Sequence, residues 1–137
     1  MATFVIDNEA LKKGWGAEGQ YWFSFIDYSI VEDFDLMHIE VPENIEKEEF
    51  FRLKDIIPYA NVKRYELAKA YIDTLDNKKI KLKFDSLENE EIVEYFWKYF
   101  HIYPDLFDGF GDFQTEYLLN VVKNWCGKHN INYTVKL

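Results

Sequence analysis

The sequence has few of the residues that separate a chain into domains. It contains six glycines and three prolines among 137 residues, and no Pro/Gly/Ser-rich linker, internal repeat or low-complexity tract interrupts it. A chain of this length fits one domain of common size. The sequence therefore predicts a single domain over residues 1–137.

Cysteine is almost absent. Cys126 is the only one, which excludes an internal disulfide and is typical of a reducing cytoplasm. No apolar run approaches the roughly 20 residues that a membrane-spanning helix needs. The first residues lack the basic and apolar regions of a signal peptide. We expect a cytoplasmic protein without a membrane partner.

Catalytic motifs are absent as well. The sequence has no P-loop, dinucleotide-binding glycine fingerprint, nucleophile elbow or HExxH motif. The pairs His101/Asp105 and Cys126/His129 have helical spacing, but neither has a third zinc ligand nearby. We expect Cys126 on the apolar side of the last helix, where burial makes a thiol inert. The sequence therefore predicts no catalytic residue, cofactor or metal site.

Apolar residues are plentiful. Hydrophobic residues make up 48% of the chain and aromatic residues 19%, enough to form a core. Helical periodicity predicts helices at Ile45–Ile57, after a cap at Asn61, at Leu87–His101 and from Asp112 to Gly127. Alternating or aromatic-rich runs predict strands at Tyr21–Tyr28, Phe34–Val41, Lys79–Phe84 and Ile131–Leu137. This mixture predicts an α+β fold, a compact domain with about four main helices packed on a small, mainly antiparallel sheet.

Two features of these elements bear on function. In Lys79–Phe84, lysines alternate with apolar residues, which we interpret as a half-buried edge strand guarded by lysine rather than a nucleic-acid surface. We expect no direct contact with nucleic acid. The broad apolar faces of the last two helices place Trp97 and Trp125 in the core.

Acidic residues are concentrated in one part of the chain. Residues 18–51 contain ten acidic residues against Lys47 alone, so this segment carries a charge of −9, equal to the net charge of the chain. Clustered acid repels nucleic acid and attracts basic partners, and aromatic residues among the acids would supply binding energy. Solubility is the simpler explanation. The partner-binding candidates in this segment are Asp27, Tyr28, Glu32, Asp33, Asp35 and Glu40.

A second candidate is the stretch YPDLFDGFGDFQ at Tyr103–Gln114, between the last two predicted helices. Its phenylalanines are expected to pack the loop onto the core, and the EF-hand pattern of a calcium loop is absent. A loop of aspartates and aromatic residues could also enter a basic pocket. The partner-binding candidates here are Asp105, Asp108, Phe110 and Asp112.

In general character the chain looks like the immunity proteins that neutralise bacterial toxins. The likeness is one of composition over the whole chain, small, acidic and aromatic-rich, without a diagnostic motif. It implies a binding protein that blocks a basic toxin, such as a nuclease, by stoichiometric occlusion. The alternatives are a small carboxylate- or metal-dependent enzyme and an adaptor or regulatory domain that binds another protein.

Overall fold

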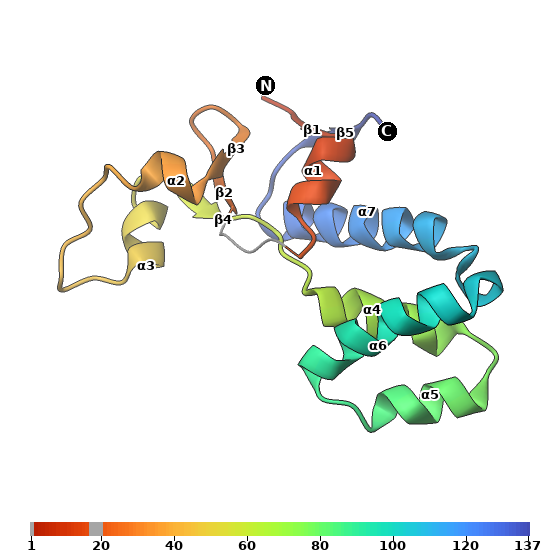
Figure 1. The fold of residues 1–137 in the computed structure, drawn as a ribbon. Helices are drawn as coiled ribbons and strands as arrows, with labels where there is room; N and C mark the ends of the chain where they lie inside the picture. Colours follow the sequence, from red (N-terminus) through yellow and green to blue (C-terminus); the bar gives the residue numbers. More distant parts are fainter. Residues whose placement is uncertain (1, 17–20) are drawn as a thin grey trace. The chain divides into compact units, whose positions relative to one another are not determined.

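The structure is a computed structural model that describes residues 2–16 and 21–137 (Figure 1). Its contacts group the chain into two compact units. Unit 1 consists of Met1–Asn61 and Leu119–Leu137, and unit 2 of Val62–Leu118. No linker in the sequence marks this division, because one of its boundaries lies within helix α7 (Phe110–Lys128). The fold class is α+β, as predicted.

Unit 1 contains the strands. β1 (Phe4–Ile6) and β5 (Tyr133–Val135) form a parallel pair. β2 (Tyr21–Ser24) lies between β3 (Ser29–Glu32) and β4 (Ile56–Pro58) in an antiparallel sheet. The alternation of the C-terminal residues therefore predicted a strand correctly, whereas nothing in the sequence analysis predicted its partner β1.

The predicted strand Tyr21–Tyr28 is confirmed only as far as Ser24. There the chain turns, and the Ser24 hydroxyl accepts a hydrogen bond from the Ile26 backbone N–H at 3.2 Å. Tyr28 has a φ of 55° in this turn, an unusual value for a residue other than glycine. The turn converts one expected long strand into the hairpin β2–β3.

The predicted strand Phe34–Val41 is wrong. The segment begins with α2 (Asp33–Leu36), a single helical turn. Leu36 is buried, whereas Phe34 is 76% exposed and Met37 is 72% exposed. A strand would have shown its side chains alternately on two faces. Here Leu36 is buried, Ile39 and Val41 are partly buried against the same cluster, and Phe34 and Met37 stay exposed.

The predicted helix Ile45–Ile57 is confirmed only over α3 (Lys47–Arg52). Asp55 takes a left-handed φ of 62°, a conformation that a short Asp side chain tolerates, and the chain then enters β4. The Asp55 carbonyl accepts a hydrogen bond from the Phe25 backbone N–H at 2.9 Å. Pairing with β2 thus overrides helix propensity in the last residues of the predicted element.

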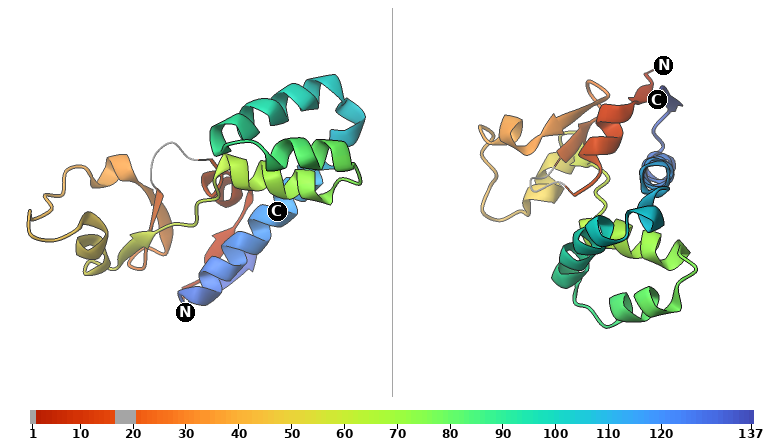
Figure 2. Two further views of the ribbon diagram at one scale, coloured as in Figure 1. Left: turned by 90° about the horizontal axis from the view of Figure 1, so that it is seen from below. Right: turned by 45° about the vertical axis from the view of Figure 1, so that its right-hand side comes forward.

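Unit 2 is built from helices. α4 (Arg64–Thr74) contacts both α5 (Lys78–Asp85) and α6 (Asn89–Ile102), and Figure 2 shows the three beside one another. A single 3₁₀ turn, η1 (Pro104–Phe107), follows α6. The aromatic core of unit 2 includes Phe96, whose ring centroid lies 5.1 Å from that of Phe107.

The predicted strand Lys79–Phe84 is also wrong, because these residues form most of α5. The Asn77 side chain caps this helix by accepting a hydrogen bond from the Ile80 backbone N–H at 3.1 Å. Ile80 and Phe84 are four residues apart on one helical face and are buried, whereas Leu82 is 69% exposed. The strand interpretation required Leu82 to be buried with them.

The two longest predicted helices are confirmed. α6 begins at Asn89 rather than Leu87, after a capping box formed by Glu88 and Glu91. α7 begins at Phe110, two residues before the predicted cap Asp112. Trp97 is 40% exposed, so its predicted place in the core is wrong.

Trp125 is half-buried in unit 1. Its indole nitrogen donates a hydrogen bond to the Pro58 carbonyl at 3.2 Å, and its ring packs edge-on against Phe23 and Tyr59. Cys126, beside it in α7, is fully buried, as predicted, and burial raises the pKa of its thiol to about 11.

Candidate functional site

α2 presents two large apolar side chains among carboxylates. Phe34 and Met37 are three residues apart, and the Met37 backbone N–H donates to the Phe34 carbonyl at 3.3 Å, which continues the helical turn. Residues at this spacing lie on neighbouring positions of one helical face. Glu32 and Asp35 are exposed beside them in the chain. We call Glu32, Phe34, Asp35 and Met37 the α2 surface.

The α2 surface has a packed apolar support in unit 1. Leu36 belongs to a buried cluster with Trp22, Phe51 and Ile56. The Trp22 and Phe51 rings meet edge to face with their centroids 5.2 Å apart. A single helical turn has little intrinsic stability. Packing against these large buried side chains therefore holds α2 in place.

Asp33 anchors α2 to this support. Its Oδ1 accepts hydrogen bonds from the Trp22 indole nitrogen at 2.9 Å and from the Lys47 ammonium at 2.7 Å. The Lys47 hydrogen bond, followed by that of Trp22, lowers the pKa of the Asp33 carboxyl. The ammonium also lies over the rings of Trp22 and Phe51, at 5.7 and 5.9 Å. Asp33 was predicted to bind a partner, but in the structure its carboxylate is bound by Trp22 and Lys47 of the same chain.

The other candidates of the acidic segment differ in their exposure. Asp27 is exposed in the β2–β3 turn, and Glu40 is exposed after α2. Tyr28 is half-buried, with its ring edge-on to Phe23, and its hydroxyl accepts a hydrogen bond from the Asn132 backbone N–H at 3.2 Å. Tyr28 thus ties the hairpin to the C-terminal segment of unit 1 and offers little surface to a partner.

The second candidate stretch lies in unit 2 and begins with η1. Asp105 and Asp108 are exposed there, and Asp112 is exposed in the first turn of α7. Phe110 is only 7% exposed, and its ring lies 4.9 Å from that of Phe96. The expectation that Phe110 binds a partner is therefore corrected, because its side chain is committed to the core of unit 2.

The expectation that the phenylalanines of this stretch pack inward is confirmed. Phe107 is buried and Phe113 is half-buried, and both rings contact the Tyr71 ring at 5.6 and 5.3 Å. The Tyr71 hydroxyl donates a hydrogen bond to the Leu106 carbonyl at 2.6 Å. Most of the aromatic content of this stretch therefore serves the packing of unit 2.

The described residues contain neither a cluster of metal ligands nor a membrane-spanning helix. Within residues 2–16 and 21–137, no three His, Cys, Asp or Glu side chains are arranged to hold a metal ion. In the same part of the chain, no helix combines the length and apolar character needed to cross a membrane.

His129 lies against Trp125, and burial lowers the pKa of its imidazole.

The apolar half of the α2 surface was not predicted from the sequence. Phe34 and Met37 were assigned to a strand, in which apolar residues are expected to be buried. The three-residue spacing of this pair, together with acidic residues at Asp33 and Asp35 in the first turn, was the available signal for a helical turn. One turn is too short for periodicity to establish it.

The comparisons with known proteins add no relative. None of the protein-family models, curated proteins or solved structures compared with the chain matches it. The case for a function therefore comes from the chemistry and geometry of this chain alone.

Proposed function

We propose that the protein is an immunity-type inhibitor that binds a basic toxin, such as a nuclease, and blocks its active or substrate-binding site in a one-to-one complex. The α2 surface is the centre of the binding site. The observation that carries the proposal is the exposure of Phe34 and Met37, 76% and 72%, in a segment where the carboxylates of Glu32 and Asp35 are exposed as well.

Apolar and acidic groups play different parts in this proposal. Binding energy in protein complexes is concentrated in a few large side chains that become buried, which suits Phe34 and Met37. Opposite charge accelerates association and selects the partner, which suits Glu32, Asp35 and the other exposed acids of the segment. A nuclease toxin binds the phosphates of nucleic acid through lysine and arginine. In the complex, the carboxylates of this segment would contact those lysine and arginine side chains in place of the phosphates.

Pre-organisation favours binding at this surface. Leu36 is buried beneath it, and Asp33 holds α2 through Trp22 and Lys47. A partner that binds there does not have to order a mobile loop, so less of the contact energy is lost to conformational entropy.

The proposal is tested by capture of the partner and titration. The wild-type chain and the double variant Phe34→Ala/Met37→Ala are used to capture proteins from the native cell, and the protein lost with the variant is purified. We expect a basic protein that binds at one-to-one stoichiometry, with an affinity reduced at least about tenfold in the variant. If the captured protein is a nuclease, one equivalent of the wild type should abolish its activity.

Ile26→Ala is the matched control. Ile26 is 74% exposed in the β2–β3 turn of the same unit, so its truncation removes a comparable exposed apolar side chain outside the α2 surface. An acidic partner, or an equal loss of affinity in the control and in the double variant, would contradict the proposal.

A further inference from the structure

Unit 2 contains a pocket lined by α5, α6 and η1. Its volume is about 380 Å³, at the small end of the roughly 300–1,000 Å³ of ligand pockets. Its lining consists of two lysines, two tyrosines, two aliphatic side chains and one amide: Lys79, Lys83, Tyr99, Tyr103, Ile80, Leu106 and Asn77. We call it the lysine–tyrosine pocket.

The charge of this pocket is opposite to that of the chain. None of the described residues that line it is acidic. Neither Lys79 nor Lys83 forms an ion pair within the described part of the chain, whereas Lys69 on α4 pairs with Asp73 and Asp85. Two lysines four residues apart on a helix repel each other. The helix therefore keeps an unneutralised cationic pair at a hollow of an otherwise acidic protein.

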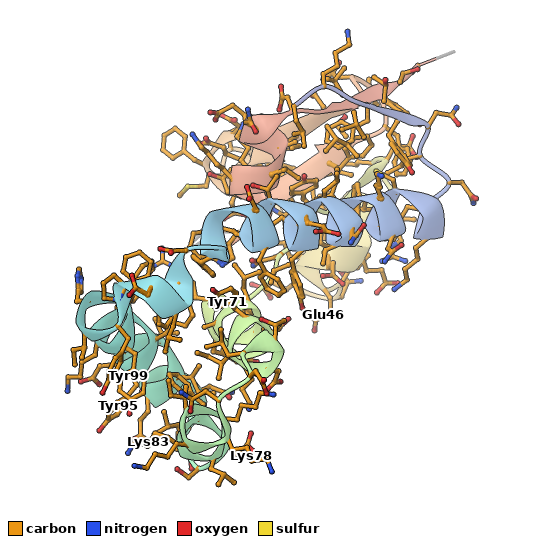
Figure 3. The ribbon with its side chains drawn as sticks, turned by 90° about the vertical axis from the view of Figure 1, so that its right-hand side faces the viewer. Glu46, Tyr71, Lys78, Lys83, Tyr95 and Tyr99 are labelled. Atoms are coloured by element: carbon orange, nitrogen blue, oxygen red, sulfur yellow. The ribbon has the colours of Figure 1, made fainter. Side chains whose placement is uncertain are left out.

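Aromatic packing orients the ring on the α6 side of the pocket. The Tyr99 ring meets Phe84 edge to face at 5.6 Å, and the Tyr103 ring at 5.9 Å. Figure 3 shows Lys83 on the side of α5 that faces Tyr95 and Tyr99, with Lys78 on the other side, and the Lys83 ammonium lies 4.7 Å from the centre of the Tyr95 ring. The Lys83 cation thus lies on the side of α5 that faces the tyrosine rings of α6.

We propose that the lysine–tyrosine pocket binds a small organic anion in which a planar aromatic ring is joined to a phosphate or carboxylate group. The ring lies against Tyr99 and Tyr103, because aromatic and apolar surfaces favour a flat apolar group. The anionic group lies by Lys79 and Lys83 and relieves their mutual repulsion. This site is independent of the α2 surface and of the toxin that it would bind.

The experiment is an NMR titration of the full chain with four probes: adenosine 5′-monophosphate, adenosine, inorganic phosphate and 3-phenylpropionate. We expect one of the two aromatic anions to bind at least about tenfold more tightly than adenosine or phosphate, since each of these supplies only one of the two contacts. The backbone shifts should lie in α5 and at the end of α6. The two anions distinguish a phosphate ligand from a carboxylate ligand.

Variants locate the site. Lys79→Ala and Tyr103→Leu should each weaken binding of the better probe at least about fivefold, whereas Lys78→Ala, on the same helix but outside the lining, should weaken it less than about twofold. Binding of phosphate as tight as that of either aromatic anion would indicate an adventitious ion only and would overturn the proposal. So would the absence of binding by both aromatic anions, or equal losses in Lys78→Ala and Lys79→Ala.

Discussion

The α2 surface and the lysine–tyrosine pocket are two regions of opposite chemistry in one chain. The first is acidic and projects exposed apolar side chains from a single helical turn of unit 1. The second is cationic and aromatic, and it is a hollow lined by helices of unit 2. The net charge of −9 does not predict the charge of either region, because acidic and basic residues are concentrated in different segments of the chain. Local charge together with surface shape, not net charge, therefore indicates the kind of partner.

The contrast in shape suggests a contrast in ligand size. Exposed apolar side chains flanked by carboxylates suit a protein partner, which can bury them over a broad interface. A pocket of about 380 Å³ is suited instead to a small molecule. The predictions below sharpen or break this comparison, from the largest expected effect to the smallest.

Each region depends on a buried phenylalanine. Phe51 is fully buried in the cluster beneath α2, and Phe84 is fully buried on α5 against Tyr99. Truncation of either to alanine should lower the free energy of unfolding by about 3–5 kcal/mol, through lost burial and a residual cavity. Urea denaturation followed by circular dichroism measures this loss.

Leu82→Ala is the control for Phe84→Ala. Leu82 lies on the same helix but is 69% exposed, so its truncation should cost less than about 0.5 kcal/mol. Equal losses for the two variants would favour the strand interpretation of this segment and would remove the helix that lines the pocket.

The two aspartates of α2, Asp33 and Asp35, should differ in their contribution to stability. Asp33→Asn should cost about 1–2 kcal/mol, because it weakens two charge-assisted hydrogen bonds, a partly buried one from Trp22 and an exposed one from Lys47. Asp35→Asn, at an exposed position without a side-chain hydrogen bond or ion pair within the described residues, should change stability little. Thermal unfolding of the two variants at neutral pH measures the difference.

The same pair predicts a pH dependence. The pKa of Asp33 is lowered in the folded protein, so its contribution is fully present above its unfolded-state pKa and is lost as the pH falls through the folded-state value. Between neutral pH and acid, the stability difference between wild type and Asp33→Asn should therefore shrink. A difference that stays constant down to strongly acidic pH would show that this carboxylate does not anchor α2.

Charge reversal tests which acids guide a basic partner. Once the partner has been purified, Glu32→Lys/Asp35→Lys should slow association several-fold, and added salt should slow the wild type more than the variant. Stopped-flow measurements at two ionic strengths provide both rates. The matched reversal in unit 2 is Asp105→Lys/Asp108→Lys, which should leave association nearly unchanged. The opposite result would move the binding site to the stretch that follows α6.

The smallest effect concerns the cationic pair of α5. Lys79→Ala removes a like-charge repulsion with Lys83 and a cation near the positive end of the helix, so it should stabilise the protein by about 0.3–0.5 kcal/mol. Lys128→Ala, in the last turn of α7, should destabilise it by a similar amount, because a cation is favourable there. Chemical denaturation of both variants measures whether the free energy of unfolding rises in Lys79→Ala and falls in Lys128→Ala. Destabilisation by Lys79→Ala would mean that this lysine is kept for folding rather than for a ligand.

The sequence by itself determined the features that extend over several turns of chain. The helices α6 and α7 and the burial of Cys126 follow from apolar periodicity sustained over about four turns or more, where only a helix keeps the apolar residues on one face. The strands of the α+β class were predicted from shorter runs, of which those that form β2 and β5 are confirmed. The concentration of acid in residues 18–51 is likewise a property of the sequence.

Only the tertiary structure decided most of the short elements and which side chains come together at the two proposed sites. In Lys79–Phe84, six residues satisfy the period of a strand and the four-residue spacing of a helix alike, and the packing of Ile80 and Phe84 selects the helix while leaving Leu82 outside. The single turn α2 exists because Leu36 is buried and Asp33 is bound by side chains distant in sequence. Local propensity is too weak over so few residues, so contacts between distant segments determine which side chains are buried and which remain for a partner.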